Sequence, residues 1–161
     1  DSSTSRGLGD VYKRQDQRVV KAKAVFPFRY NSDCRGSQPF RPQLAENVYA
    51  APQIPVSLPT WDEVVGSSVS AEGFNRFILD RMHRAQGTPV YTIHAEVEGI
   101  IGADAFDQLL TLAAHEEITF CPLGQLLPDD VTTLPPGKVV RGEVVGREGW
   151  LGCQKLLSAQ R

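Results

Sequence analysis

The sequence predicts an α/β fold built around a parallel sheet. From residue 70 onward, two amphipathic segments alternate with short runs of β-branched and aromatic residues, in the order helix, strand, helix, strand. This alternation is typical of parallel strands that are joined by helical crossovers. The 161 residues contain too few such strands to close a barrel by themselves.

The two helices are predicted from the spacing of their apolar residues. The first covers residues 70–86, where Gly87 and Pro89 end the pattern. The second covers residues 104–115 and has the same three- and four-residue spacing. The apolar stripes consist of Phe74, Phe77, Ile78 and Met82 in the first helix, and of Phe106, Leu109, Leu110 and Ala113 in the second.

Strands, turns and one long loop are predicted for the rest of the folded region. Residues 35–52 are rich in Gly, Pro, Gln and Asn and are expected to form a long surface loop. Thr60 and Glu63 fit a capping box that begins a short helix. Strands are predicted at 26–34, 53–58, 90–94 and 118–120, the end of a helix at 16–25 and a helical turn at 122–127.

Three regions are predicted along the chain. Asp10–Gln15, DVYKRQ, matches a translated sequencing-library adaptor, so residues 1–15 are expected to be non-native and are left out of the fold prediction. Residues 16–133 are expected to form the folded domain. The glycine-rich tail, residues 134–161, is expected to form either a hairpin or an extended segment on that domain.

Composition and charge narrow the function classes. The chain is 41% hydrophobic and 22% charged, which is typical of a globular protein. A net charge of -2 argues against a nucleic-acid partner, since phosphate binding needs a clustered positive field. No apolar run reaches the length of a membrane-spanning helix. Three widely spaced cysteines favour reduced thiols in a cytosolic protein.

His94 is the main candidate for chemistry. It follows Val90–Ile93 at the end of a predicted strand, where the active sites of parallel α/β folds gather. Histidine changes its charge near neutral pH, so it can exchange protons there. A structural histidine at a strand end is an equally open interpretation. His83 and His115 are expected at the surface and at a helix end, and no two histidines have the spacing of metal ligands.

Asp33 is the predicted partner of His94. It lies at the end of the first predicted strand, and the ends of parallel strands share one rim of a sheet. A carboxylate beside an imidazole orients the ring and favours its protonated form, which is the form of a general acid. The sequence also allows Asp33 to cap its own loop or to pair with Arg35.

Six stretches of sequence carry a resemblance to a known family. They are FRYNSDCRG, PFRP, QIPVSLPTWDEV, GTPVYTIHAEVEG, TFCPL and VVRGEVVGREGWLGCQ. In this order they resemble the carboxyl-terminal half of bacterial enzymes of the polysaccharide deacetylase (NodB-homology) family, from Asp16 almost to Arg161. The resemblance implies the corresponding half of a distorted (β/α) barrel, without the amino-terminal half that would complete it.

The resemblance also implies a reaction. It is the hydrolytic removal of a formyl group from a formamido sugar on undecaprenyl phosphate, at the cytoplasmic face of the bacterial inner membrane. The product sugar decorates lipid A and protects against cationic peptides such as polymyxin. The family's histidine general acid matches His94, and the carboxylate that tunes it matches Asp33. The family's divalent metal and its general base belong to amino-terminal motifs that this sequence lacks, so no catalytic metal is expected to bind here and the fragment is expected to be inactive.

The sequence also contains further candidate substrate-binding residues and allows alternative functions. Arg29 and Arg35, with Arg41, suit bidentate contacts to a substrate phosphate, or ordinary surface ion pairs. Trp61 and Glu96 are further substrate-binding candidates. The Glu143–Gln154 segment, with Trp150 and Leu151, is expected either to touch a membrane surface or to pack on the domain. The alternative functions are deacetylation of another N-acyl sugar, and a non-catalytic module that binds a sugar-lipid or a protein.

Overall fold

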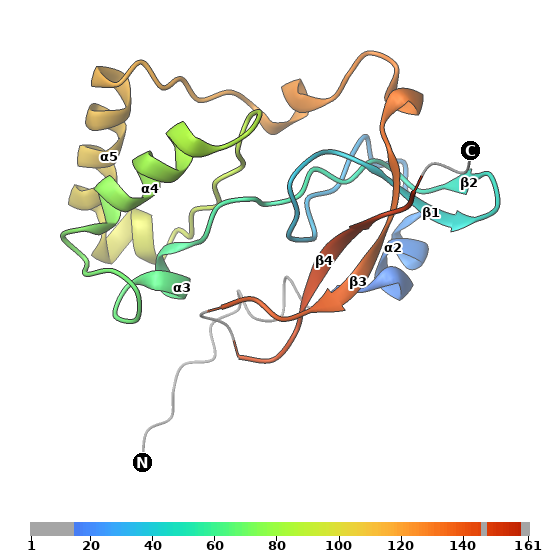
Figure 1. Ribbon diagram of the computed structural model, residues 1–161, viewed down its shortest axis with the longest axis horizontal. Coiled ribbons are helices and arrows are strands. Elements are labelled where there is room, and N and C mark those ends of the chain that lie inside the picture. The colour runs from blue at the N-terminus through green and yellow to red at the C-terminus, as the bar shows by residue number, and fades with distance from the viewer. Residues whose placement is uncertain (1–14, 146–147, 159–161) are drawn as a thin grey trace. The chain divides into compact units, whose positions relative to one another are not determined.

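The computed structural model describes residues 15–145 and 148–158 (Figure 1). They form two compact units. The sheet unit combines the described residues up to Pro55 with those from Leu126 onward, and the helical unit is Val56–Gln125. Each unit has a hydrophobic core of its own. The predicted adaptor segment lies outside the described residues except for Gln15, and the predicted domain boundaries stay predictions.

The sheet unit contains a four-stranded sheet in the order β2-β1-β3-β4. The inner strand β1 (Arg41–Ala45) pairs with β2 (Val48–Tyr49) in antiparallel and with β3 (Pro136–Gly142) in parallel orientation. β3 and β4 (Leu151–Leu156) form an antiparallel hairpin. The hairpin alternative for the glycine-rich tail is therefore correct.

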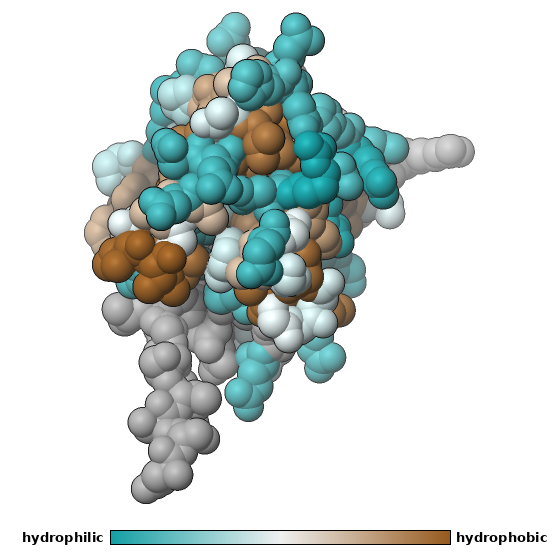
Figure 2. Space-filling model, turned by 90° about the vertical axis from the view of Figure 1, so that its left-hand side faces the viewer, coloured by the Kyte–Doolittle hydropathy of each residue, from teal (hydrophilic) through white to brown (hydrophobic). Residues whose placement is uncertain are grey.

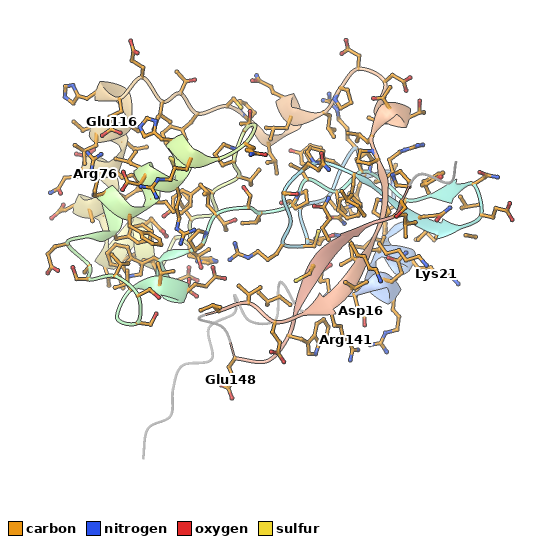
Figure 3. The ribbon with its side chains drawn as sticks, in the orientation of Figure 1. Asp16, Lys21, Arg76, Glu116, Arg141 and Glu148 are labelled. Carbon is orange, nitrogen blue, oxygen red and sulfur yellow. The ribbon has the colours of Figure 1, made fainter. Side chains whose placement is uncertain are left out.

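Helix α2 (Gln17–Lys23) contacts β1 and β3 in the sheet unit. Its amino end is capped by Asp16, whose carboxylate accepts a hydrogen bond from the Arg18 N–H at 3.0 Å. The same carboxylate pairs with the Arg141 guanidinium of β3 at 3.0 Å and so ties the helix to the sheet (Figure 3). The core of this unit consists of Val20, Cys34, Phe40 and Val139.

The helical unit packs α4 (Phe74–Arg84) against α5 (Ala103–His115). A short helix α3 (Trp61–Val64) precedes them, and a π-helix η1 (Val97–Ile101) leads into α5. Arg76 of α4 pairs with Glu116, directly after α5, at 2.7 Å (Figure 3). The buried core of this unit consists of Leu58, Val64, Phe74, Ile78, Leu79, Leu109 and Ala113. Two short 3-10 helices follow, η2 (Leu123–Leu126) and η3 (Val131–Thr133).

Several predicted elements are wrong, although the mixed α/β character is confirmed. The segments 26–34 and 53–58 contribute only isolated bridges, and 90–94 and 118–120 carry no strand. The predicted loop 35–52 contains β1 and β2. The reason is that a strand requires a partner along its length, and the hydrogen bonds of these apolar runs are confined to a few positions and do not continue as a ladder. Leu110, predicted on the buried face of its helix, is exposed.

The surface of the helical unit shows apolar areas among hydrophilic ones (Figure 2). The large apolar side chains exposed in this unit are Ile93, Ile100, Ile101, Leu110 and Phe120. In the sheet unit, Leu151 is only 1% exposed, so it packs in the interior, which is the second of its two predicted roles. None of the helices in the described ranges is both long enough and apolar enough to span a membrane.

Candidate functional site

The segment that carries His94 lies beside the chain that enters α3. The N–H groups of Ser57 and Leu58 donate to the Val90 carbonyl at 3.2 and 3.0 Å. The Val90 N–H donates in return to the Ser57 hydroxyl at 2.8 Å. These three bonds fix the start of the histidine segment beside Ser57 and Leu58, three to four residues before α3 begins, without forming a strand.

Asp62, in the first turn of α3, faces the ring of His94. The His94 Nδ1 lies 3.7 Å from the Asp62 Oδ1, and their side chains are 24% and 38% exposed. The predicted capping box is confirmed, because the Thr60 N–H donates to the Glu63 carboxylate at 2.9 Å and the reciprocal bond is present. α3 is only four residues long, and the box fixes the turn that carries Asp62.

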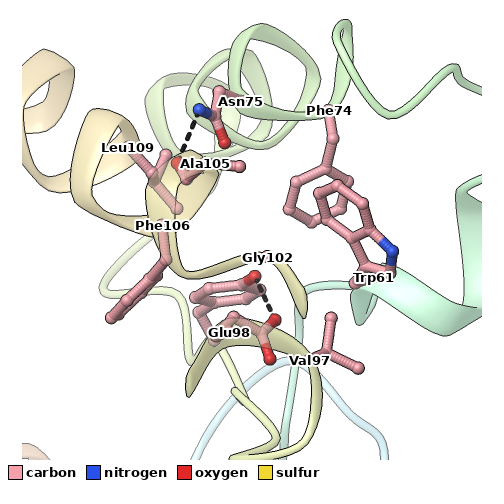
Figure 4. A pocket seen from close by; sticks show the side chains of 10 residues that line it. Trp61, Phe74, Asn75, Val97, Glu98, Gly102, Ala105, Phe106 and Leu109 are labelled. Carbon is pink, nitrogen blue, oxygen red and sulfur yellow. Dashed lines mark hydrogen bonds between the residues drawn. The ribbon is translucent and has the colours of Figure 1, made fainter. Parts of the chain in front are cut away.

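The carboxylate of Glu98 binds the backbone at His94. It is a buried carboxylate in the π-helix η1, four residues after the histidine. One of its oxygens accepts the His94 N–H at 2.7 Å. The other accepts the Tyr91 hydroxyl at 3.0 Å, a bond that is dashed in Figure 4. Burial, and secondly the charge of Glu98, raise the pKa of Tyr91, so its hydroxyl stays a neutral donor. π-Helical turns are often found at functional sites.

A small open pocket lies against these residues in the helical unit (Figure 4). Aromatic rings form one wall: the Trp61 and Phe74 centroids are 4.7 Å apart, and those of Phe74 and Tyr91 are 6.5 Å apart. The Asn75 amide donates to the Ala105 carbonyl at 2.8 Å and joins α4 to α5. Trp61 thus lines a pocket beside the histidine segment, and its predicted part in substrate binding stays a prediction.

Asp33 lies in the sheet unit, where two other side chains bind it. It is 3% exposed, and its Oδ2 is 2.7 Å from the Lys23 ammonium. The Gln53 amide donates to the same oxygen at 3.1 Å, and its carbonyl accepts the Asp33 N–H at 3.0 Å. The predicted pairing of Asp33 with His94 would join the two units, and it stays a prediction.

The remaining candidate substrate-binding residues differ in their contacts and exposure. Arg41 stacks on the Tyr49 ring at 4.3 Å and donates to the Leu134 carbonyl. The backbone of Arg35 pairs with β4 through Gly152 and Gln154, while Arg29 and Glu96 are exposed. Their predicted substrate contacts stay predictions.

The described residues contain no group of three His, Cys, Asp or Glu side chains that could hold a metal ion. The buried thiol of Cys34 has a raised pKa, primarily because burial penalises the thiolate. A protonated thiol is a poor metal ligand, because the thiolate is the form that binds metals. The described part of the chain therefore does not fit the divalent metal of the predicted family.

Sequence reasoning missed Asp62, Glu98 and Lys23. The four-residue spacing of His94 and Glu98 was a usable signal, because residues four apart in a helical turn lie on the same side. The contacts of Asp62 with His94 and of Lys23 with Asp33 bridge residues 32 and 10 positions apart, and no local pattern marks such pairs.

Two known proteins are similar in sequence to this chain. The chain is 40% identical over 145 residues to a protein from Wigglesworthia glossinidia brevipalpis, covering 89% of this chain and 51% of the relative. It is 44% identical over 137 residues to a protein from Shewanella sediminis, covering 84% of this chain and 43% of the relative. Both are named as a probable 4-deoxy-4-formamido-L-arabinose-phosphoundecaprenol deformylase.

The chain resembles these deformylases. The names of these relatives therefore confirm the resemblance that the sequence analysis identified. The chain spans about half the length of the curated deformylases that it matches. No family model matches it.

Proposed function

We propose that this chain is the carboxyl-terminal half of the catalytic domain of a deformylase, within a distorted (β/α) barrel of the NodB type. Its substrate would be 4-deoxy-4-formamido-L-arabinose-phosphoundecaprenol. The observation that carries the proposal is the identity of 40% and 44% to two deformylases across most of this chain. The mixed α/β fold is compatible with it.

His94 would donate a proton to the departing amine. Hydrolysis breaks the bond between the formyl carbon and the sugar nitrogen, and water supplies the hydroxyl of formate. The nitrogen must gain a proton as it leaves, because an amide anion is a very poor leaving group. A histidine suits this step, since it exchanges protons near neutral pH and its ring is partly open to solvent here.

The divalent metal implied by the family would bind outside this chain. The described residues do not fit such an ion, and we assign no step of the reaction through it to them. Its ligands would lie in the half of the enzyme that the chain does not cover. The 161-residue chain alone is accordingly expected to release no formate.

The lipid part of the proposed substrate supports a proposed location of the enzyme at a membrane surface. The relatives are named for a polyprenyl-linked sugar, which resides in a membrane because of its long apolar chain. Peripheral binding at the cytoplasmic face of the inner membrane is part of the proposal. Arg29 is exposed and Arg35 partly so, and both remain proposed contacts for the phosphate.

Product analysis tests the proposed reaction. The full-length Shewanella sediminis relative would be incubated with two lipid-linked sugars that differ only in carrying a formyl or an acetyl group on nitrogen. Formate release with little acetate is expected. Preferential release of acetate would instead indicate an enzyme that deacetylates an N-acyl sugar. Binding of the lipid-linked sugars without any turnover would favour a module that binds a sugar-lipid.

A further inference from the structure

We propose that Gln154, in β4 of the glycine-rich tail, is a positioning residue for the phosphate of the substrate. It acts through Arg35, because it fixes the turn 35–38 from which the arginine side chain extends. This inference rests on the proposed function, in which Arg35 contacts the phosphate. It goes further by giving the carboxyl-terminal hairpin of the sheet unit a part in substrate binding.

The first observation is that the backbone of Arg35 is bound to β4 through both of its polar groups. The Arg35 N–H donates to the Gly152 carbonyl at 2.8 Å, and the Arg35 carbonyl accepts the Gln154 N–H at 2.6 Å. These two bonds form a parallel bridge between Arg35 and Cys153. Burial raises the pKa of the Cys153 thiol, and the charge of Arg35 opposes this rise. The Arg35 charge therefore also acts on β4.

The second observation is that the side chain of Gln154 spans the turn. Its Oε1 accepts the Ser37 N–H at 2.9 Å, and its Nε2 donates to the Gln38 carbonyl at 2.7 Å. A primary amide carries its acceptor and its donors on separate atoms, so one side chain satisfies both backbone groups. The turn lies between Cys34 and Phe40, which are buried in the core of the sheet unit. Gln154 thus ties the middle of the turn to a strand that is paired along its length with β3.

The third observation is the close approach of Gly36 to Gln154. A Cβ atom added at Gly36 would lie 2.6 Å from both the Cβ and the Oε1 of Gln154. Such a distance is shorter than van der Waals contact allows, so a larger residue at this position would displace Gln154 or the turn. Glycine is therefore required here to bring the turn within reach of the amide.

The consequence for substrate binding is a turn that is ordered before the phosphate arrives. A guanidinium binds phosphate through two parallel donors, which requires a defined direction of approach. Fixing the backbone that carries Arg35 in advance lowers the ordering cost of binding. Without the amide of Gln154, the turn loses two of its bonds to β4. The substrate should then bind more weakly, whereas the chemical step should proceed at its usual rate.

Steady-state kinetics of a full-length deformylase test the proposal. In the Wigglesworthia glossinidia brevipalpis relative, the positions that correspond to Gln154, Arg35 and Lys155 are changed, and formate release is followed over a range of concentrations of the lipid-linked formamido sugar. Q154M, which is similar in size but lacks the amide, is expected to raise KM about tenfold with little change in kcat. K155M, at the next and exposed position of β4, is the control and should keep the wild-type KM.

A double variant shows whether Gln154 acts through Arg35. R35M is expected to raise KM at least as much as Q154M does. The variant that combines both changes should then have the KM of R35M alone, because there is no arginine left to position. A purely structural role of Gln154 would instead add its effect to that of R35M.

Amide hydrogen exchange in the 161-residue chain gives a second measurement that does not depend on turnover. Ser37 is exposed, but its N–H is bound by Gln154, so this N–H should exchange more slowly than a solvated one. Q154M and G36A are expected to lose this protection. A Ser37 N–H that exchanges without protection in the wild-type chain overturns the proposal, even where neither variant folds.

The kinetic outcomes separate this proposal from the proposed function. An unchanged KM in Q154M, a fall in kcat alone, or additive effects of Q154M and R35M would each overturn the role of Gln154 and leave the deformylase reaction in place. A wild-type relative that releases no formate would overturn the proposed function, and this inference with it. That failure is seen without any variant, so the two are distinguishable.

Discussion

Asp33 in the sheet unit and Glu98 in the helical unit are both buried carboxylates, and they are stabilised in different ways. In the sheet unit, Asp33 is paired with a cation, Lys23, and a side-chain amide. In the helical unit, the donors to Glu98 within the described part of the chain are neutral: the Tyr91 hydroxyl and the His94 N–H. The first arrangement neutralises a charge, whereas the second uses a charge to fix a segment of backbone. The difference predicts which substitutions each unit tolerates.

The aromatic core of the helical unit is expected to give the largest effect. Phe74 is 1% exposed and contacts Trp61 and Tyr91, so F74A should lower the free energy of unfolding by about 3–5 kcal/mol. Denaturant unfolding followed by Trp61 fluorescence in a W150F background measures it. The exposed Phe120 offers the control, since F120A should change stability by about 0.5 kcal/mol or less. Equal losses in both variants would show that Phe74 does not form the core.

Removal of the cation from the sheet unit comes next. K23M leaves the 3%-exposed Asp33 without its charge partner and should cost about 3 kcal/mol. The unfolding of this unit is followed by Trp150 fluorescence in a W61F background. K21M, on the same helix but at an exposed position, is the matched control and should be nearly neutral. Adding D33N to K23M should recover part of the loss, and a failure to do so would contradict the pairing.

A smaller effect is expected for Glu98 in the helical unit. E98Q keeps an acceptor for the His94 N–H but weakens the bond to Tyr91, so it should cost about 1–2 kcal/mol. Denaturant unfolding with the Trp61 reporter measures it, and E96Q, at an exposed position, is the control. If E98Q destabilised the protein as strongly as K23M, the distinction between the two buried carboxylates would be lost.

The smallest effect is an acid dependence of the sheet unit. Hydrogen bonds from the Arg18 side chain, and also from Arg141, lower the pKa of Asp16 from 3.8 to about 2. A carboxyl group whose pKa is lower in the folded state adds stability above pH 3.8, and this contribution is lost as the pH falls toward 2. Acid unfolding followed by Trp150, which stacks on Arg141, should begin at higher pH in D16N. If the acid transitions of the wild-type protein and of D16N superimpose, Asp16 does not contribute to the stability of the sheet unit.

The sequence predicted the helices better than the sheet. α4 and α5 carry their own signal, because the apolar spacing that places Phe74 and Ile78 on one face is local. The capping box of Thr60 and Glu63 is equally local. Strand formation depends on a partner far along the chain, and β1 pairs with β3 across more than ninety residues. The apolar run before His94 therefore looked like a strand, although it forms no ladder.

The candidate site shows the same limit. His94 could be singled out by its residue type and its surroundings in the sequence. Its neighbours Asp62 and Glu98 come from a capped turn and from a π-helical turn, and neither geometry follows from composition. The pairing of Asp33 with Lys23 depends on how α2 packs in the sheet unit, which no sequence pattern determines.

Turnover by a full-length deformylase tests the central claim most directly. In the Shewanella sediminis relative, the histidine that corresponds to His94 is changed to alanine, and formate release from the lipid-linked formamido sugar is followed, with circular dichroism to verify folding. A proton donor predicts a fall in kcat of about 100-fold or more with little change in KM. A folded variant that releases formate at the wild-type rate would contradict the assignment of His94.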